Sequence, residues 1–165
     1  YEAGSDETAR AMGYADGLGL RTYVTGLGYV PDGDLPELYR RARATLVLSR
    51  SEGFAFPVLE SMACGTPVIH SAAGAVSEAA GGAGIEVPDD EEEIARAMTR
   101  VHADESFRAE RIAKGLERAA QFRWSKTADR LLELFAEVGG SGAGDARSAH
   151  GASTAKHAVP VGSAH

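Results

Sequence analysis

Residues 48–70 read LSRSEGFAFPVLESMACGTPVIH, and this stretch determines the expected fold. A short apolar run leads into a glycine-bearing loop, then into a helix-favouring stretch at 57–64 and a second apolar run at 67–70. Pro57 suits the first helical turn because it has no N–H to lose, and Gly65 suits the left-handed residue with which helices commonly end. The stretch therefore predicts a strand, a short helix and another strand.

The flanking sequence continues this alternation of short apolar runs and amphipathic stretches. Four runs rich in β-branched and aromatic residues are predicted as strands, at 21–25, 44–48, 67–70 and 84–87. Further helices are predicted at 6–16, 34–43, 89–102, 107–121 and 126–138. The predicted helix caps are Asp34, Asp89 and Ser125, the first two with a Glu three residues on. The alternation indicates an α/β fold, a Rossmann-like parallel sheet with flanking helices.

The composition changes at residue 139, where Gly, Ala, Ser and His replace the apolar periodicity. Such a segment buries too little to offset its ordering entropy, so residues 139–165 are predicted to be a disordered tail. The 165-residue chain has the length and the 44% hydrophobic, 25% charged composition of one globular domain. That domain is predicted to occupy residues 1–138.

Charge and cysteine content exclude several classes of function. Seventeen Lys and Arg against 24 Asp and Glu give a net charge of −7, the wrong sign for binding a nucleic-acid backbone. The single cysteine, Cys64, excludes an internal disulfide and a zinc site built on a Cys pair. No apolar run approaches the roughly 20 residues that cross a bilayer. The predicted location is the cytoplasm, and peripheral attachment to a membrane stays open without positive support.

Two carboxylates flank the predicted short helix. Glu52 lies in the loop before it, and Glu60 lies one turn into it. In open parallel sheets ligands bind at the carboxyl ends of the strands, where a helix N-terminus favours phosphate. A carboxylate accepts paired hydrogen bonds from a vicinal diol, so both residues suit a ribose or a hexose. The alternative is that both only complement the helix dipole, at roughly 0.3 to 1 kcal/mol each.

The complete string resembles the motif of family 4 of the retaining glycosyltransferases, Glu-Gly-Phe-Gly-Leu-Pro, two residues, then Glu-Ala-Met-Ala-x-Gly-x-Pro-Val. In this chain the two parts are EGFAFP at 52–57 and ESMACGTPV at 60–68. Three flanking segments are similar to the family as well: LGYVPDGDLPELY at 27–39, AGAVSE at 73–78, which is expected to form a turn, and RAAQFRW at 118–124. The resemblance covers residues 6–138 and implies part of the C-terminal, donor-binding domain of a GT-B fold.

The resemblance implies a role for each residue of the motif. Glu60 should hydrogen-bond the ribose hydroxyls of a nucleotide-sugar donor, and Glu52 should be the catalytic residue, beside the transferred sugar and holding its hydroxyls. Tyr29 and Val30 should line the nucleobase pocket.

Backbone groups complete the implied donor site. The donor-binding set at the helix start comprises Gly53, Phe54, Ala55, Phe56, Pro57 and Val58. Within it, the N–H groups of Phe54 and Ala55 should meet the sugar, and those of residues 56–58 the diphosphate. The resemblance implies neither a metal ion nor any other cofactor.

Two positions depart from the family pattern. Ala55 stands where the family usually has Gly, and its Cβ is expected to narrow the approach of the sugar and to disfavour a positive φ. His70 replaces a small residue. A lone His at a strand end is predicted to be packed or solvated and not catalytic.

The resemblance also implies parts that lie outside this sequence. Family members hold the diphosphate with an Arg and a Lys, and bind the acceptor with a further, N-terminal domain, all upstream of the matching segment. Two strands of the sheet are expected upstream as well. In the order of strands within the sheet, they would lie between the strands predicted at 21–25 and 44–48. The isolated chain is therefore expected to be inactive, and to be unstable or to self-associate.

The reaction implied for the longer protein is transfer of a sugar from a nucleotide diphosphate to a hydroxyl acceptor, with retention at the anomeric carbon. The nucleotide, the sugar and the acceptor stay open. The alternative is a non-catalytic fragment that binds nucleotide or sugar. A Rossmann dehydrogenase is disfavoured, because the GLG segments at 17–19 and 26–28 lack the third glycine and do not lie between a strand and a helix.

Overall fold

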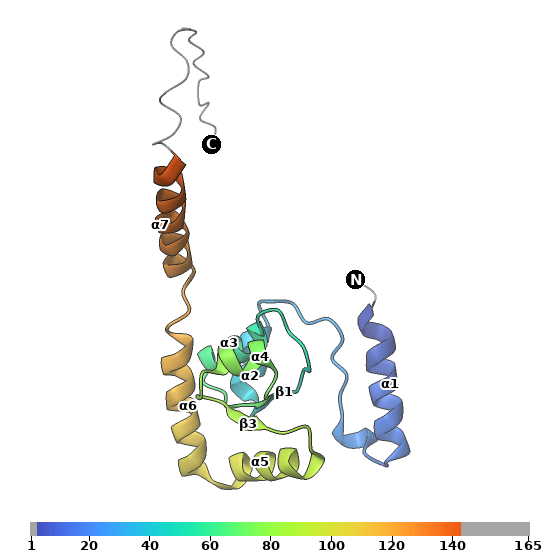
Figure 1. Cartoon of the computed structure of the whole chain (residues 1–165). Coiled ribbons are helices and arrows are strands. Elements are labelled where there is room, and N and C mark those ends of the chain that lie inside the picture. Colours follow the sequence, from blue (N-terminus) through green and yellow to red (C-terminus); the bar gives the residue numbers. More distant parts are fainter. Residues whose placement is uncertain (1–2, 143–165) are drawn as a thin grey trace, which may run out of the picture. The chain divides into compact units, whose positions relative to one another are not determined.

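The computed structural model describes residues 3–142 (Figure 1). The chain forms two compact units, one ending at Phe122 and the other beginning at Arg123. The described part of the second unit consists of Arg123 and helix α7, Trp124–Gly142, and this helix continues past the predicted domain end at residue 138. The rest of the predicted tail, residues 143–165, lies outside the described residues.

A parallel sheet forms the centre of the first unit. Its three strands are β1 (Thr45–Val47), β2 (Val68–Ser71) and β3 (Ile85–Val87), in the order β1-β2-β3. Thr45 pairs with Val68 at the start of β2, and Ile69 pairs with Ile85 at the start of β3. The sheet confirms the α/β fold and the strands predicted at 44–48, 67–70 and 84–87.

The strand predicted at 21–25 was wrong. Arg21–Tyr23 forms a short 3₁₀ helix, η1, and Val24 leaves it in an extended conformation. A β-branched and aromatic run forms a strand only where a neighbouring strand satisfies its hydrogen bonds. The described sheet runs from β1 to β3 and does not reach this segment.

Helices cover both faces of the sheet. The described helices of the first unit are α1 (Ala3–Gly17), α2 (Leu35–Arg41), α3 (Phe56–Ala63), α4 (Gly74–Ala80), α5 (Glu91–Ala103) and α6 (Glu105–Ala119), of which α3, α4 and α5 pack on the sheet. Helices α3 and α4 pack on one face and α5 on the other (Figure 1). Among the described helices, none combines the length and the apolar character needed to cross a bilayer.

The segment expected as a turn at 73–78 is instead the start of α4. Val76, Ala79 and Ala80 are buried in the core, so tertiary packing stabilises a helix that begins with a glycine. Gly81 ends this helix in the left-handed conformation, with φ 54°.

The capping predictions were displaced by one residue or wrong. Asp90, and not Asp89, caps α5 and accepts a hydrogen bond from the Glu93 N–H at 2.9 Å. Ser125 lies inside α7 and does not precede it. Asp34 precedes α2 as predicted, but its side chain makes no capping bond.

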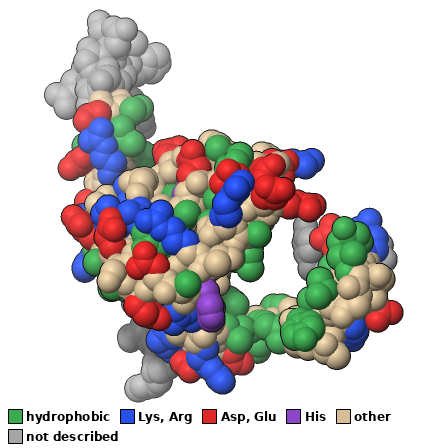
Figure 2. Space-filling view, turned by 90° about the horizontal axis from the view of Figure 1, so that it is seen from below, with side chains coloured by type: hydrophobic (Ala, Val, Ile, Leu, Met, Phe, Trp, Pro, Cys, Tyr) green, Lys and Arg blue, Asp and Glu red, His purple; other side chains and the backbone are tan. Residues whose placement is uncertain are grey.

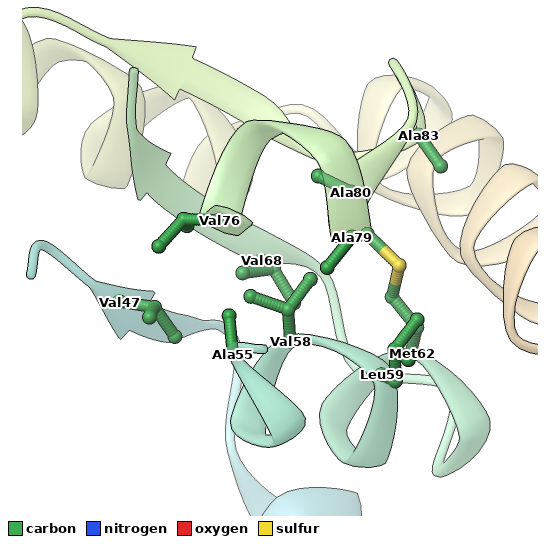
Figure 3. Close-up of a cluster of buried hydrophobic side chains, with 10 residues drawn as sticks. All are labelled: Val47, Ala55, Val58, Leu59, Met62, Val68, Val76, Ala79, Ala80 and Ala83. Carbon is green, nitrogen blue, oxygen red and sulfur yellow. The ribbon is translucent and has the colours of Figure 1, made fainter. Parts of the chain in front are cut away.

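Two apolar clusters hold the layers together. Figure 3 shows the first, in which Val47 and Val68 from the sheet meet Val58 and Met62 from α3. The second lies on the other face and contains Ile69 together with residues of β3 and α5. Successive residues of β2 enter opposite clusters because strand side chains alternate between the two faces.

Helix α6 packs antiparallel to α3 and positions its start. A Cβ placed on Gly115 would lie 3.2 Å from Cγ of Met62, and one placed on Gly65 would lie 3.9 Å from Cγ2 of Ile112. Gly115 therefore permits a close approach of the two helices. The chain leaving α6 then reaches the amino end of α3, where Phe122 contacts Phe54.

Apolar side chains remain exposed on the segment between α1 and α2, where Figure 2 shows them gathered. The larger ones are Leu18, Leu20, Tyr23, Val24, Leu27 and Tyr29. A contiguous run of this kind favours association with other apolar surfaces. The expected self-association of the chain thus has a candidate surface.

Candidate functional site

Ala55 joins the loop after β1 to helix α3. Its backbone is left-handed, with φ 59° and ψ 50°. Its side chain is only 3% exposed and points into the apolar cluster that contains Val47 and Val58 (Figure 3). Contrary to expectation, the residue adopts a positive φ, and its Cβ faces the core and leaves the outer side of the loop clear. A left-handed alanine costs roughly 1 to 2 kcal/mol, which the burial of its methyl group partly offsets.

The first turn of α3 presents fewer backbone donors than residues 56–58 suggest. Pro57 has no N–H, and the Val58 N–H donates to the Ala55 carbonyl at 3.0 Å. Of residues 56–58, the N–H of Phe56, at the first helical position, therefore remains as a donor. First-turn N–H groups lack an acceptor within the helix and carry the positive end of its dipole.

Glu52 lies exposed in the same loop and is held by Ser49. Ser49 Oγ donates to Glu52 Oε1 at 2.7 Å. Ser71, at the end of β2, donates from its hydroxyl to the Ser49 carbonyl at 2.6 Å. These bonds tie the loop to the carboxyl end of the central strand.

Glu60 lies one turn into α3, on its exposed side. The hydroxyl of Tyr39, in α2, donates to Glu60 Oε2 at 3.1 Å. Burial, and then the hydrogen bond to this carboxylate, raise the pKa of Tyr39 to about 12, so the phenol remains a donor well above neutral pH. Thr66 in turn donates to the Tyr39 carbonyl at 2.6 Å. The carboxylate of Glu60 is thus held from a neighbouring helix.

The predicted ligand-binding side chains of the loop and of α3 are exposed. Phe56 and Glu60 stand four residues apart, hence on one helix face, and both are exposed, as is Glu52. The opposite face, with Val58 and Met62, is buried in the core. The predicted convergence of the two glutamates at the start of α3 is compatible with this arrangement.

A hollow of about 420 Å³ lies beside α2. Its lining includes Tyr29 and Val30, the residues predicted for a nucleobase, together with Leu27, Pro31, Asp34, Glu37, Leu38 and Arg41. The volume is within the roughly 300 to 1,000 Å³ of small-molecule sites. Leu38 lines the hollow and its neighbour Tyr39 holds Glu60, so α2 links the hollow to the carboxylate on α3.

His70 is packed in the core, which is one of the two predicted alternatives, packed or solvated. It is 2% exposed, and its Nδ1 lies 2.9 Å from the Ser71 carbonyl. A Cβ placed on Gly84 would lie 2.4 Å from the imidazole Cδ2. Gly84 therefore provides the space that the ring occupies.

Several residues near the site carried no predicted role, although they fall in segments that resemble the family. Tyr39 closes the segment at 27–39, and Arg118 and Phe122 belong to the segment at 118–124. Their segments were the available signal, because their contacts join residues far apart in sequence. Within residues 3–142, no group of three or more His, Cys, Asp and Glu side chains is arranged to hold a metal ion.

The chain is similar in sequence to known glycosyltransferases. Residues 3–118 match the family described as glycosyl transferases group 1. The chain is 38% identical over 114 residues to O-antigen chain mannosyltransferase B of Escherichia coli, covering 68% of this chain and 30% of that protein. It is 34% identical over 140 residues to D-inositol 3-phosphate glycosyltransferase of Salinispora arenicola, covering 82% and 31%. The chain thus spans about a third of the length of these relatives.

Solved structures share the fold. Sucrose-phosphate synthase from Thermosynechococcus elongatus superposes with a TM-score of 0.75 at 31% identity, covering 82% of this chain and 35% of that one. Anabaena HepE, in complex with UDP and glucose, gives a TM-score of 0.74 at 23% identity, covering 83% and 38%. Both likenesses support a GT-B fold. By its sequence match over residues 3–118, this chain belongs to the group 1 glycosyltransferases.

Proposed function

We propose that this chain carries part of the donor site of a retaining glycosyltransferase, which moves a sugar from a nucleotide diphosphate to a hydroxyl acceptor. The observation that carries the proposal is the arrangement at α3. A helix start at the carboxyl end of a parallel sheet stands beside two exposed carboxylates, Glu52 and Glu60, each held by a hydroxyl donor. The strand-end position is where open α/β sheets bind phosphorylated ligands.

Each side chain has a defined part in the proposed reaction. Glu60 accepts hydrogen bonds from the ribose hydroxyls, while Tyr39 fixes the orientation of its carboxylate. Glu52 accepts from hydroxyls of the transferred sugar and keeps the anomeric carbon near the acceptor. The N–H of Phe56 and the dipole of α3 favour the leaving diphosphate.

The bond changes follow from retention. The bond between the anomeric carbon and the diphosphate oxygen breaks, and the acceptor oxygen bonds to that carbon on the same face of the sugar. The acceptor proton leaves with the nucleoside diphosphate. Positioning and electrostatic stabilisation are the contributions of the protein, and neither requires a metal ion.

The relatives support this choice of substrate class. Proteins similar to this chain are named as an O-antigen chain mannosyltransferase and a D-inositol 3-phosphate glycosyltransferase, and a structure of the same fold was solved with UDP and glucose. A nucleotide-sugar donor is therefore the proposed partner. The proposed nucleobase position is the hollow lined by Tyr29 and Val30.

The proposal is tested by donor affinity. Amide NMR titration of the 165-residue chain with UDP-glucose and with GDP-mannose gives a dissociation constant for each. Loss of a charged hydrogen-bond acceptor costs about 1.5 to 3 kcal/mol, so Glu60→Ala should weaken the preferred donor about tenfold or more. Glu92→Ala removes an exposed carboxylate on α5 and is the matched control. Equal effects of the two substitutions would remove the assigned role of Glu60.

The second candidate is a non-catalytic module that binds a nucleotide or a sugar. The observation that favours this candidate for the isolated chain is that the chain spans about a third of the length of its relatives. Binding without transfer by residues 1–165 agrees with it, whereas transfer to any acceptor by this chain alone contradicts it. The NMR titration with the nucleotide sugar, repeated in the presence of EDTA, tests whether binding needs a metal ion. If it does not, the dissociation constant is unchanged.

A further inference from the structure

Arg118 ties three parts of the first unit together. From α6, its Nε donates to the Ala79 carbonyl at 3.0 Å and its Nη2 to the Glu78 carbonyl at 2.6 Å. Its Nη1 donates to Oε1 of Gln121 at 2.9 Å. The guanidinium thus caps the last carbonyls of α4, where a cation is favourable.

Gly81 makes room for this guanidinium. A Cβ placed on Gly81 would lie 2.4 Å from Nε and 2.6 Å from Cζ of Arg118. The neighbouring Gly82 also has a positive φ, 78°, but a Cβ placed there meets nothing within 4 Å. An alanine at either position would bear the backbone strain of a positive φ. Only an alanine at Gly81 would also displace Arg118.

A series of aromatic contacts runs from Arg118 to the start of α3. Its guanidinium carbon lies 4.6 Å from the centroid of the Phe122 ring. Phe122 meets Phe54 edge to face, with centroids 6.2 Å apart at 76°, and Phe54 meets Phe56 at 4.7 Å. Rings and a cation at these distances attract one another.

The loop that receives these contacts has few others to define it. A Cβ placed on Gly53 would meet no atom within 4 Å, so this residue is not packed against the rest of the unit. Among the described residues, the Glu52 carboxylate bonds only within the loop, to Ser49. Ala55 anchors the loop on its core side, and the ring of Phe54 meets Phe122, three residues after the end of α6. The conformation of residues 53–55 consequently depends on where Phe122 holds the Phe54 ring.

We propose that Arg118 and Phe122 are positioning residues of the donor site, which fix Phe54 and thereby the backbone N–H groups that meet the transferred sugar. The identity of the ligand rests on the proposed function, whereas the ordering of the loop by Arg118 and Phe122 does not. Neither side chain touches the donor itself. Their effect is on the sugar half of the donor, because the loop and not the hollow beside α2 responds to them.

The experiment compares Gly81→Ala, Phe122→Leu and the control Gly82→Ala in the 165-residue chain. Amide relaxation at residues 53–56, without ligand, reports the order of the loop. Affinities for UDP-glucose or GDP-mannose, whichever wild type prefers, are set against the affinity for the same nucleoside diphosphate without its sugar. This ratio isolates the contribution of the sugar and cancels any general loss of folded protein.

Gly81→Ala and Phe122→Leu should lower the order of residues 53–56 and reduce the sugar contribution roughly three- to tenfold, the range that an aromatic pair supplies. Gly82→Ala should match wild type in both. Unchanged loop order and an unchanged ratio in the first two variants would overturn the inference. A wild type that binds no nucleotide would instead remove the proposed function, and the loop order of the variants would still decide whether Arg118 and Phe122 position Phe54.

Discussion

Substituting Gly84 by Ala tests whether the central strand is packed as described. The new Cβ would lie 2.4 Å from Cδ2 and 2.7 Å from Nε2 of His70, and 3.3 Å from the Val68 carbonyl. Ordinary contacts need about 3.5 Å, so the imidazole must move by roughly 1 Å. His70 is 2% exposed and has little space into which to move. Overpacking of this kind costs about 1 to 3 kcal/mol.

The unfolded state reduces this cost. Replacing Gly by Ala removes chain entropy from the unfolded state and stabilises by about 0.4 to 1 kcal/mol. The net destabilisation by Gly84→Ala should therefore be about 1 to 2 kcal/mol. In the double variant His70→Ala, Gly84→Ala the methyl enters vacated space, so the double variant should be more stable than the sum of the single effects by about 1 kcal/mol or more.

Urea unfolding measures this cycle, and a comparison of two protein concentrations shows whether association contributes to the measured stability. Gly74→Ala is the control, since a Cβ at Gly74 meets nothing within 4 Å and its φ is not positive. Strict additivity of His70→Ala and Gly84→Ala, or a Gly84→Ala variant as stable as the control, would refute the packing of the ring against Gly84.

Three further predictions concern other parts of the chain. Gly115→Leu should destabilise by about 2 to 3 kcal/mol, because the side chain would enter the contact with Met62; a urea midpoint equal to that of wild type contradicts the helix packing. The pKa of Tyr39 is raised to about 12 from its usual value near 10, so the stability that depends on its neutral phenol is present below pH 10 and lost as the pH rises toward 12. In Tyr39→Phe the free energy of unfolding should fall less between pH 10 and pH 12 than in wild type. A difference in stability between the two proteins that is the same at pH 10 and at pH 12 contradicts this. The 165-residue chain should self-associate through the exposed segment that contains Tyr23 and Tyr29, and a concentration-independent monomer in sedimentation, with sharp thermal unfolding, contradicts this.

Local chemistry was enough to predict the centre of the fold. The helix predicted at 57–64 from Pro57 and Gly65 differs by one residue at each end from the observed α3, Phe56–Ala63, because each of the two residues has a backbone property that a helix interior tolerates poorly. The three observed strands were predicted because their β-branched runs lie between predicted helices, and in the structure they do pair with one another.

The errors arose where tertiary partners decide the local structure. Residues 21–25 have strand propensity, but the described sheet does not reach them. Asp89 and Asp90 are equivalent as caps on sequence grounds, and only the geometry of the turn selects Asp90. The helix at α4 depends on the burial of Val76, which propensity does not reveal.

The candidate site was predictable as a motif but not as a set of contacts. The residues Glu52 and Glu60 stand out in the sequence, whereas the bond from Tyr39 to Glu60 joins residues 21 positions apart. The buried direction of the Ala55 side chain depends on its left-handed backbone, which a residue with a Cβ seldom adopts. Neither feature has a local sequence signal.

The most direct test of the donor site is a map of amide shift changes on adding the nucleotide sugar that the chain prefers. The account predicts the largest changes at Gly53, Phe54 and Phe56, at Glu60 on α3, and around Tyr29. Shift changes that gather on α5, or that leave the start of α3 unaffected at saturating donor, would contradict it.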